Sequence, residues 1–437
     1  MAKKKVELTP EEKLAQALVP KEEQPYEIPE GWKWVHIGDV ASVKGGKRLP
    51  KGHELTEEKT KHPYIRVTDF CDGSVDCSNL KYITEETAES IKRYIITDQD
   101  VFISIAGTIG KVGIIPSFLN GSNLTENAAK LCELSSFVDN RYLCKVLSSP
   151  FSQLQISQST KTTTQAKLAL SRIENIIIPL PPLEDQQRIV ERIESLFSKL
   201  DEAKEKAQAV VDGFELRKSA ILHKAFSGEL TAKWREEHGV GLESWEKKAL
   251  KDILDVRDGT HDSPLYYDEG YALVTSKNLK NGTITDDGIK YISREDFIKI
   301  NERSKVDIGD ILFAMIGTIG NPVVVENEPN YAIKNVALLK NVGKVNPYYV
   351  KYYLESQYVK DKMKKEAKGS TQRFVPLGYL RKFEIVVTIN DEQKEIVRIL
   401  GSLLAKEARA KEAAEAVLEQ VEVMKKAVLA RAFRGEL

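Results

Sequence analysis

Three shortages in this sequence of 437 residues each exclude a class of protein. The four cysteines lie in the first half and form no C-x-x-C pair: Cys71, Cys77, Cys132 and Cys144. This distribution does not fit a disulfide scaffold or a structural zinc site, so we interpret them as reduced thiols. The six histidines show no metal-ligand spacing, and we predict no metal site. No apolar run approaches the ~18 residues of a membrane helix and the N-terminal segment lacks the apolar core of a signal peptide, so we expect a cytoplasmic protein.

Net charge and enzyme motifs are also missing. The 65 basic residues balance 65 acidic ones, whereas a free-standing, non-specific nucleic-acid binder is usually basic, so any DNA contact must come from local patches or from partners. The sequence contains no G-x-x-x-x-G-K-[ST], no G-x-G-x-x-G opening a helix and no H-E-x-x-H. Residues 346–349 (NPYY) come nearest to a base-flipping loop, but we interpret them as a helix N-terminus. We therefore predict no catalytic residue and no cofactor in this chain.

What the sequence does contain is an internal duplication, with a shift of about 207 positions between the copies. Residues 102–112 (FISIAGTIGKV) recur as 312–322 (LFAMIGTIGNP), and 224–230 (KAFSGEL) recur as 431–437 (RAFRGEL). This period is far longer than the about 20–50 residues of solenoids, so it indicates two copies of a whole domain. A chain with an internal two-fold suits a ligand with two similar places to hold, and duplex DNA is the commonest such ligand.

Each copy consists of a globular part followed by a long helix. Short runs rich in β-branched and aromatic residues, such as 101–105, predict strands separated by glycine, aspartate and asparagine. Pro179, Pro181 and Pro182 are expected to end the last strand of the first copy, and Asn390 with Asp391 is expected to cap the second long helix. The predicted organisation is an N-terminal arm at 1–24, a domain at 25–182, a helix at 183–230, a connector and second domain at 231–389, and a helix at 390–437. The fold class is therefore α+β, with two mixed α/β domains.

Two features of these parts have more than one interpretation. In the arm, the capping box at 9–12 (TPEE) opens a short helix, and the arm is either a docking segment or a loosely packed tail. After the strand at 101–105, Gly107, Gly110 and Gly113 could suggest a phosphate cradle. No helix follows them, however, so a tight turn is the better interpretation.

The two long helices carry matching heptad patterns. Apolar residues step by four and three along both, with a break at Arg217 in the first and at Glu407 in the second. Two such seams in one chain predict an antiparallel coiled coil with an internal pseudo-two-fold; the alternative is that each seam packs only on its own globular domain. The predicted seam comprises Ile189, Ile193, Leu196, Leu200, Ala203, Ala207, Val210, Phe214 and Ile221 in the first helix, and Ile396, Leu400, Leu403, Ala410, Ala414, Val417, Val421, Met424 and Val428 in the second.

Three strings resemble conserved regions of the specificity subunit of type I restriction-modification systems: 178–190 (IPLPPLEDQQRIV), 228–235 (GELTAKWR) and 432–437 (AFRGEL). The resemblance covers nearly the whole chain, in the family's order of target-recognition domain, helix, target-recognition domain, helix. It implies a non-catalytic subunit that binds the two halves of a split double-stranded DNA site and on which two methylation subunits and then restriction subunits assemble. S-adenosylmethionine and ATP would then bind to those partners. In the second copy, 386–392 (VVTINDE) lacks the double proline, which puts in doubt how sharply that strand passes into its helix.

Base recognition is expected where the copies differ. The loop after the first strand contains KGGKR at 44–48 and RDGTH at 257–261, and RVTD at 66–69 faces LVTS at 273–276. Arginine can bond guanine and asparagine or glutamine can bond adenine, so unlike loops predict unlike half-sites, although for any single residue a solvated surface charge is the alternative. A third pair, KTTTQ at 161–165 and KGSTQR at 368–373, is suited to phosphate contact. The candidate DNA-binding residues are Lys44, Lys47, Arg48, Arg66, Thr68, Lys161, Thr162, Gln165, Arg257, Thr260, His261, Lys277, Asn278, Ser370, Thr371, Gln372 and Arg373.

The length of the helix pair is expected to determine the separation of the two DNA half-sites. If the helices pair antiparallel, they act as a ruler between the half-sites, and one heptad corresponds to roughly 10 Å or about three base pairs at ~3.4 Å per pair. The rival hypothesis is a coiled-coil scaffold that joins proteins without nucleic acid.

Overall fold

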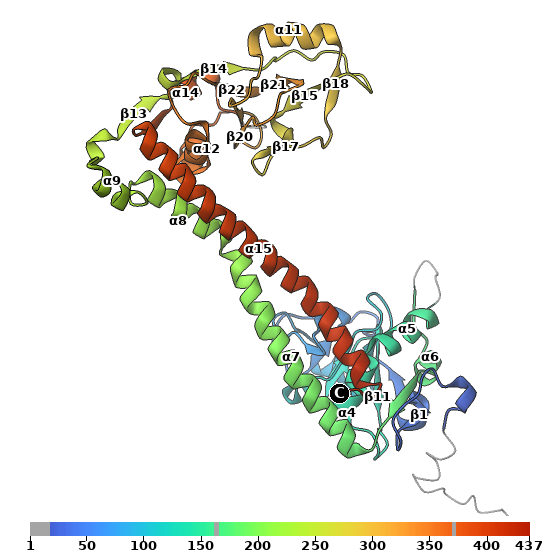
Figure 1. Cartoon of the computed structure of the whole chain (residues 1–437). Coiled ribbons are helices and arrows are strands. Elements are labelled where there is room, and N and C mark those ends of the chain that lie inside the picture. Colours follow the sequence, from blue (N-terminus) through green and yellow to red (C-terminus); the bar gives the residue numbers. More distant parts are fainter. Residues whose placement is uncertain (1–17, 161–165, 369–372) are drawn as a thin grey trace, which may run out of the picture. The chain divides into compact units, whose positions relative to one another are not determined.

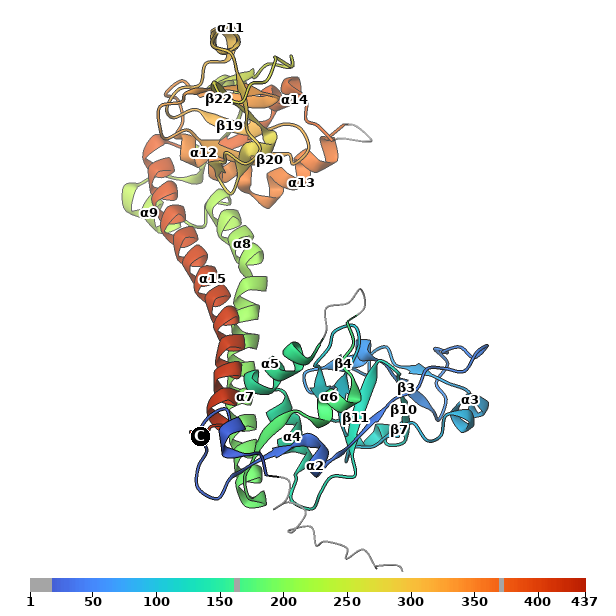
Figure 2. The same ribbon diagram turned by 90° about the vertical axis from the view of Figure 1, so that its right-hand side faces the viewer.

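The computed structural model describes residues 18–160, 166–368 and 373–437 (Figures 1 and 2). Its contacts divide the chain into two units: unit 1 comprises Met1–Ala207 with Ala416–Leu437, and unit 2 comprises Gln208–Glu415. Each unit therefore combines one globular domain with parts of two helices that lie far apart in the sequence. Among the described residues, no helix combines the length and apolarity that crossing a membrane requires. The helix expected at 9–12 lies outside the described residues.

The first copy contains small sheets and short helices followed by two longer helices. Its elements are η1 (Lys21–Glu23), β1 (Lys33–His36), α2 (Ile37–Val40), β2 (Ser42–Gly45), β3 (Pro63–Ile65), η2 (Val67–Asp69), β4 (Phe70–Cys71), β5 (Ser74–Val75), β6 (Lys81–Tyr82), α3 (Glu85–Ser90), β7 (Ile95–Ile96), β8 (Val101–Ser104), β9 (Val112–Gly113), η3 (Ser117–Leu119), β10 (Ser122–Leu124), β11 (Ala128–Cys132), α4 (Asn140–Leu147), α5 (Pro150–Ser159), α6 (Leu170–Glu174), β12 (Ile177–Leu180), α7 (Leu183–Asp212) and α8 (Phe214–Phe226). The strand orders are β2-β11-β8-β9 and β6-β3-β10-β7, while β1 pairs with β12 and β4 with β5. Pro179 does not end the last strand as predicted, because it lies within β12 opposite Trp34, and only Pro181 and Pro182 follow the strand. All four residues of β8 are buried, which fits their apolar and β-branched character.

The second copy repeats this arrangement. Its elements are α9 (Ala232–His238), η4 (Leu242–Ser244), β13 (Glu246–Ala249), α10 (Leu250–Ile253), β14 (Leu254–Asp258), β15 (Tyr271–Thr275), η5 (Ser276–Asn278), β16 (Leu279–Lys280), β17 (Thr283–Ile284), β18 (Lys290–Ile292), α11 (Arg294–Ser304), β19 (Ile311–Ala314), β20 (Gly320–Val324), β21 (Tyr331–Lys334), β22 (Val336–Asn341), α12 (Pro347–Glu355), α13 (Gln357–Glu366), α14 (Leu377–Lys382), β23 (Glu384–Val387) and α15 (Asn390–Ala432). The strand order β14-β22-β19-β20 matches β2-β11-β8-β9, and β13 pairs with β23 as β1 pairs with β12. The sheet β18-β15-β21 matches β6-β3-β10 and has three strands, whereas the first copy adds β7 as a fourth. Helix α11, which packs beside β21 in Figure 1, is longer than its counterpart α3.

The repeated GTIG segments form tight turns. Gly107 and Gly110 have φ values of 75° and 91°, and Gly317 and Gly320 have 77° and 118°, which are backbone conformations that favour glycine. The chain leaves each turn into a strand, β9 or β20, rather than into a helix. The interpretation as a tight turn is confirmed for Gly107 and Gly110, whereas Gly113 lies in β9. Residue 346 precedes a helix as predicted, since Asn346 caps α12 with its side chain.

The start of each long helix is held by a buried glutamine. Gln186 in α7 and Gln393 in α15 are 0% and 2% exposed. Each accepts a hydrogen bond at 2.9 Å on its side-chain oxygen, from the backbone N–H of Asp139 and Asn346 respectively, the residues that cap α4 and α12. The second copy therefore passes from strand to helix as tightly as the first, although it lacks the double proline.

Two local predictions about the long helices are wrong. Asn390 does not cap α15, because it is already the first helical residue and the buried Glu392 receives a hydrogen bond from Thr388 instead. The helix predicted at 183–230 is divided into α7 and α8 at Gly213. There the guanidinium of Arg217 donates to the carbonyl oxygen of Val210 at 2.8 Å, beside a residue with low helix propensity.

Both units confirm the antiparallel direction of the helix pair. In unit 1, Lys204 of α7 binds Glu422 of α15 at 2.8 Å, and Asp201, three residues earlier, binds Lys425, three residues later. In unit 2, the two seam breaks bind each other, since Arg217 Nε donates to Glu407 Oε2 at 2.7 Å. Partner numbers on α15 fall as those on α7 and α8 rise, as antiparallel helices require. A polar pair within an apolar seam is a known means of fixing helix register.

The predicted seam is correct in α7 but shifts in α15. Three of its members are exposed: Ala410, Val417 and Met424. The half-buried residues are instead Lys411, Leu418 and Lys425, one position further along; the other predicted seam residues are buried or half-buried. The shift begins at Glu407, because the half-buried residues of α15 are there spaced by four residues twice in succession (403, 407, 411). An α-helix drifts by ~20° per heptad against a strict 3.5-residue repeat, and a further step of four restores the phase.

The ends of the long helices belong to the domain cores. In unit 1, Ile189 and Ile193 of α7 share a core cluster with Phe433, which follows α15 and lies beside Tyr142 of α4, with ring centroids 5.5 Å apart. In unit 2, Phe226 of α8 contacts Tyr349 of α12 in the same way, at 5.4 Å. Each domain thus packs on the start of its own helix and on the end of the other copy's helix. The recurring KAFSGEL and RAFRGEL strings carry these two phenylalanines.

Candidate nucleic-acid interface

The differing loops leave the same edge of a sheet in both units. In unit 1, β3 and β10 run parallel, with Ile65 opposite Leu124. In unit 2, β15 and β21 run parallel, with Thr275 opposite Lys334. The carboxyl ends of parallel neighbours lie side by side, so the residues that follow them are brought together in space.

One glycine in each unit holds a third loop against these strand ends. The N–H of Gly46 donates a hydrogen bond of 2.9 Å to the carbonyl oxygen of Ala128 in β11, and the N–H of Gly259 donates one of 2.9 Å to that of Val336 in β22. A Cβ atom on Gly46 would lie 2.0 Å from the carbonyl oxygen of Thr125, and one on Gly259 would lie 2.3 Å from that of Ile333, so no larger residue fits. This contact places the loops at 44–48 and 257–261 beside the strand ends, and it confirms that the two loops are equivalent.

In unit 1 this edge carries exposed basic and hydroxyl groups. Arg48 has an 80% exposed side chain, and its Nε donates to Glu126 Oε1 at 2.8 Å. Lys47 is exposed, with its ammonium 5.5 Å from the ring centroid of Tyr94, and Thr68 is exposed on η2. The structure therefore brings together Lys47, Arg48 and Thr68 from the predicted set, and adds Glu126, whose position after β10 gives no signal in the sequence.

In unit 2 the equivalent edge carries different groups on the same frame. His261 stands at the position of Arg48, and Asn335 stands at that of Glu126. The ring Nδ1 of His261 lies 2.7 Å from Asn335 Oδ1, and its Nε2 lies 2.9 Å from Asp258 Oδ2. Lys277 is exposed on η5, and the hydroxyl of its neighbour Ser276 donates to the carbonyl oxygen of Asn335 at 3.0 Å. A guanidinium–carboxylate pair in one unit thus corresponds to an imidazole–amide pair in the other.

The placement of Asn278 among the DNA-binding candidates is corrected by the structure. Its side chain is 2% exposed, accepts a hydrogen bond from the N–H of Thr275 and donates to the carbonyl oxygen of Thr285. Arg66 and Asp69 form the same capping box in unit 1, so 66–69 is equivalent to 275–278 and not to 273–276. Asn278 is therefore used to stabilise its own turn, with Thr275 as its partner in the capping box. In the equivalent box of unit 1, Asp69 holds Arg66.

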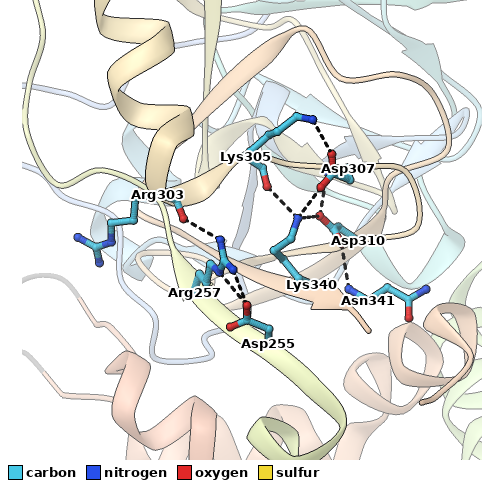
Figure 3. Close-up of polar contacts among 8 residues, drawn as sticks. All are labelled: Asp255, Arg257, Arg303, Lys305, Asp307, Asp310, Lys340 and Asn341. Atoms are coloured by element: carbon cyan, nitrogen blue, oxygen red, sulfur yellow. Dashed lines mark hydrogen bonds and ion pairs between the residues drawn. The ribbon is translucent and has the colours of Figure 1, made fainter. Parts of the chain in front are cut away.

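Arg257 and Lys44 are bound to neighbouring acidic side chains. Figure 3 shows the guanidinium of Arg257 against Asp255, at 2.6 Å, and against the carbonyl oxygen of Arg303. Lys44 forms an ion pair with Glu133. Arg257 lies on β14, which pairs with β22, and Lys44 lies on β2, which pairs with β11. A DNA contact by either residue would have to replace these ion pairs.

A second group of charged side chains in Figure 3, Asp307 and Asp310 with Lys340, fixes β22, the strand next to β14. Lys340 of β22 lies 2.7 Å from Asp307 and 3.0 Å from Asp310. Asp310 is 2% exposed and also accepts the N–H of Asn341 at 2.9 Å. A buried carboxylate with this number of partners is satisfied, so the cluster supports the sheet on which the loop at 257–261 stands.

The third predicted pair lies largely outside the described residues. This applies to Lys161, Thr162, Gln165, Ser370, Thr371 and Gln372. Arg373 is described and exposed, and its carbonyl oxygen accepts the N–H of Gly317 in the GTIG turn at 3.0 Å. The turn and Arg373 line a groove of about 1030 Å³ that also contains Lys360 and Lys364, two exposed lysines of α13. Their spacing of four residues on one helix face is a signal that the sequence analysis did not use.

A histidine with two acceptors should make DNA affinity depend on pH. Hydrogen bonds to Asn335 and Asp258 raise the pKa of His261, because a neutral ring has one N–H and cannot donate to both acceptors. The protonated form, which attracts phosphate, is therefore kept to higher pH than in an ordinary histidine, and affinity is expected to fall as pH rises through this raised pKa. Titrating DNA binding of the assembled complex from about pH 6 to pH 9 measures it.

The matched variants for this prediction are His261→Asn and Arg48→Gln. The first should remove the pH-dependent part, and the second should lower affinity equally at every pH, since arginine does not titrate in this range. An unchanged pH profile in His261→Asn would contradict the assignment.

Among the described residues, no group of three or more histidine, cysteine, aspartate or glutamate side chains is arranged to hold a metal ion.

A family model and three related sequences point to one family. The model of the type I restriction modification DNA specificity domain matches residues 29–211 and 242–420. The specificity subunit of type I restriction enzyme EcoKI from Escherichia coli (strain K12) is 21% identical over 94% of this chain and 90% of its own. The MjaVIII specificity subunit from Methanocaldococcus jannaschii is 25% identical over 94% of each chain. The EcoBI specificity subunit from Escherichia coli is 31% identical over 48% of this chain and 44% of its own.

Solved structures share the fold. The HsdS subunit from Thermoanaerobacter tengcongensis superposes with a TM-score of 0.66 at 22% identity, covering 95% of this chain and all of that one. A chain from work on complex assembly and conformational transition of the type I R-M system gives a TM-score of 0.74, also at 22% identity, over 94% of this chain and all of its own. The two family-model matches fall one on each copy of the duplication.

Proposed function

Because this chain belongs to the type I restriction modification DNA specificity family, we propose that its two units bind the two unlike halves of one asymmetric, bipartite DNA site. The family accounts for sequence-specific DNA recognition as the role of the chain. The finer assignment concerns which edge of each unit meets the bases. We place it at the carboxyl ends of the parallel strands, with Lys47, Arg48 and Thr68 in unit 1 and Thr260, His261 and Lys277 in unit 2.

One observation carries this assignment: the same frame presents different chemistry in the two units. Gly46 and Gly259 hold equivalent loops by equivalent contacts, yet the exposed pair is Arg48 with Glu126 in one unit and His261 with Asn335 in the other. Arginine suits guanine, whereas an imidazole beside an amide presents a different set of hydrogen-bonding groups. A frame that is kept while its exposed groups change is expected of two sites that bind different sequences.

The chemistry of modification belongs, in this proposal, to the partners. Two methylation subunits assemble with this chain and restriction subunits join them, and these partners bind S-adenosylmethionine and ATP in the cytoplasm. The family membership supports association with such subunits. The absence of nucleotide-binding motifs in the sequence supports a non-catalytic role. Methyl transfer by the isolated chain would contradict it, and a complex that protects no DNA in footprinting would favour the rival scaffold.

Exchanging the exposed pair of unit 1 for that of unit 2 is expected to change one half of the site only. The double variant Arg48→His with Glu126→Asn should lose discrimination of ~1–3 kcal/mol, about 5–150-fold, at the contacted position of the first half-site. The second half-site should stay as it is. Sequencing the methylated sites in cells that carry the chain and its partner subunits measures both halves at once.

The control is Lys33→Ala, which removes an exposed lysine on β1, a strand of a different sheet from β3 and β10. It should leave both halves of the methylated sequence unchanged. If the double variant leaves both halves unchanged as well, the strand-end assignment is wrong, whereas the family membership is unaffected.

A further inference from the structure

In unit 1 the ring of Tyr26 is enclosed by four groups. Its ring centroid lies 4.8 Å from that of Trp34 and 5.4 Å from that of Phe151, both in edge-on contacts. Its hydroxyl donates to the carbonyl oxygen of Phe433 at 3.0 Å, and the guanidinium of Arg434 lies 5.7 Å from its centroid. Burial raises the pKa of Tyr26 to about 12. A segment near the start of the chain thus fills a socket formed by the globular domain and the end of α15.

The duplication supplies a counterpart for each wall of this socket in unit 2. Trp34 faces Pro179 across β1 and β12, and Lys247 faces Val386 across β13 and β23, so Lys247 stands at the position of Trp34. The other three follow from the shift of about 207 residues that relates the copies. The counterparts of Trp34, Phe151, Phe433 and Arg434 are Lys247, Tyr358, Phe226 and Ser227.

These four counterparts line one pocket, with a volume of about 570 Å³. Leu216 and Tyr358 form part of its wall and are 76% and 57% exposed, an unusual degree for large apolar side chains that lie together. The connector at 231–244, all of which is described, contributes no residue to the lining. The pocket therefore has the walls of the Tyr26 socket without a side chain of the chain's own second copy inside it.

The sequence of the connector explains this difference. In unit 1, Pro29 packs so closely on Gly435 that a Cβ there would lie 2.1 Å from its ring, and Leu242 packs on the equivalent Gly228 in unit 2. Tyr26 precedes Pro29 by three residues, and the residue at the same distance before Leu242 is Gly239, which ends α9 with φ 64°. The second copy thus has no ring to place in its own socket.

We propose that this pocket of unit 2 binds an extended acidic segment of a partner protein that bears an aromatic side chain, as residues 22–30 fill the socket of unit 1. The charge agrees with such a segment. The pocket is lined by Lys247, Lys362 and His223 against the single carboxylate of Glu384. The segment at 22–30 (EEQPYEIPE) contains four glutamates and no basic residue. This inference is independent of how the units bind DNA.

A second copy of this chain is a less suitable occupant than a partner protein. Its own acidic segment is already held within unit 1, where Gln24 Nε2 donates to the carbonyl oxygen of Val19 at 3.0 Å and Val19 N–H donates to that of Trp34 at 3.0 Å. Occupying the socket of another molecule would require these bonds and the Tyr26 contacts to break. A partner segment has no such cost and gains the burial of an aromatic ring.

The probe for this proposal is a fluorescein-labelled synthetic peptide of residues 20–32 of this chain, titrated with the complete protein and followed by fluorescence polarisation. Saturable binding of one peptide per chain is expected. A peptide with Tyr26→Ala should bind at least about tenfold more weakly, since buried aromatic anchors dominate such interfaces. A peptide with its glutamates replaced by glutamine should also bind more weakly, and the difference should shrink as salt is raised.

Matched variants of the protein locate the site. Leu216→Asp and Tyr358→Ala alter exposed walls of the unit 2 pocket, and each should weaken peptide binding by at least about tenfold. Val423→Asp alters the position equivalent to Leu216 on α15, also exposed, and should leave binding unchanged because Tyr26 already fills the socket of unit 1. Because all three residues are exposed, the variants should keep the unfolding midpoint of the parent chain.

Several outcomes would overturn the proposal. These are absence of saturable binding, equal binding by the Tyr26→Ala peptide, or loss of binding in Val423→Asp but not in Leu216→Asp. A photoreactive residue at the Tyr26 position of the peptide should crosslink to 216–227 or 353–362, and crosslinks confined to unit 1 would also overturn it. Dimers of the chain that the peptide dissociates would assign the pocket to a second copy instead.

Discussion

Replacing Phe433 by alanine is expected to destabilise unit 1 by about 3–5 kcal/mol, the usual cost of removing a buried phenylalanine ring. Phe433 is 1% exposed and lies against Tyr142 of α4, although the two residues are almost 300 positions apart in the sequence. The loss should appear as faster amide exchange in α4, with little change in α12 of unit 2. Hydrogen exchange of the complete chain, followed by mass spectrometry, measures both helices in one experiment.

Two controls make this result specific. Met424→Ala truncates a side chain of α15 that is 49% exposed, and it should change exchange in neither helix. Phe226→Ala should have the opposite effect. Exchange should become faster in α12, because Phe226 contacts Tyr349, and should not change in α4. Equal exchange of α4 in Phe433→Ala and in the parent chain would contradict the proposal that each domain depends on the end of the other copy's helix.

Much of the architecture could be predicted because it repeats. Two copies of one pattern gave the element order, the start of the long helices at Leu183 and Asn390, and the direction in which they pair. The polar breaks at Arg217 and Glu407 looked like defects in each seam separately. They bind each other in the structure, which a periodicity along one helix could not reveal, because the contact depends on the register between two helices.

The candidate interface was predictable as a set of loops but less so residue by residue. Asn278 has the residue type of an adenine contact, yet its amide is used entirely within its own turn. Glu126 has no motif of its own and is placed beside Arg48 by the parallel pairing of β3 and β10. A residue's type determines which hydrogen bonds it can form, whereas tertiary structure determines which of them remain for a ligand. This explains why the loop pairs were identified more securely than their members.

Removing facing heptads from both long helices is expected to shorten the spacer of the DNA site by about three base pairs, because seven residues span roughly 10 Å of helix. The structure identifies which segments face each other: Asp201 binds Lys425 and Lys204 binds Glu422. Deleting 200–206 together with 420–426 therefore removes both sides of the same contacts and keeps the seam residues in phase on either side. The prediction rests on α15 being one helix that contributes to both units. Whether its length determines the distance between the half-sites is what the deletion tests.

Sequencing methylated sites in cells that carry the deleted chain and its partners gives the spacer directly, with both half-site sequences expected to be those of the parent. The control is deletion of 200–206 alone, which removes Asp201 and Lys204, leaves Lys425 and Glu422 without these partners, and shifts the remaining seam of α7 by seven residues against α15. Since helices that differ in length by one heptad must give up either the Arg217–Glu407 pair or the packing of their ends in the domain cores, this variant should lose stability and methylation rather than acquire a new spacer. A double deletion that methylates sites with the parent spacer would show that the helices hold the domains together without measuring the distance between them.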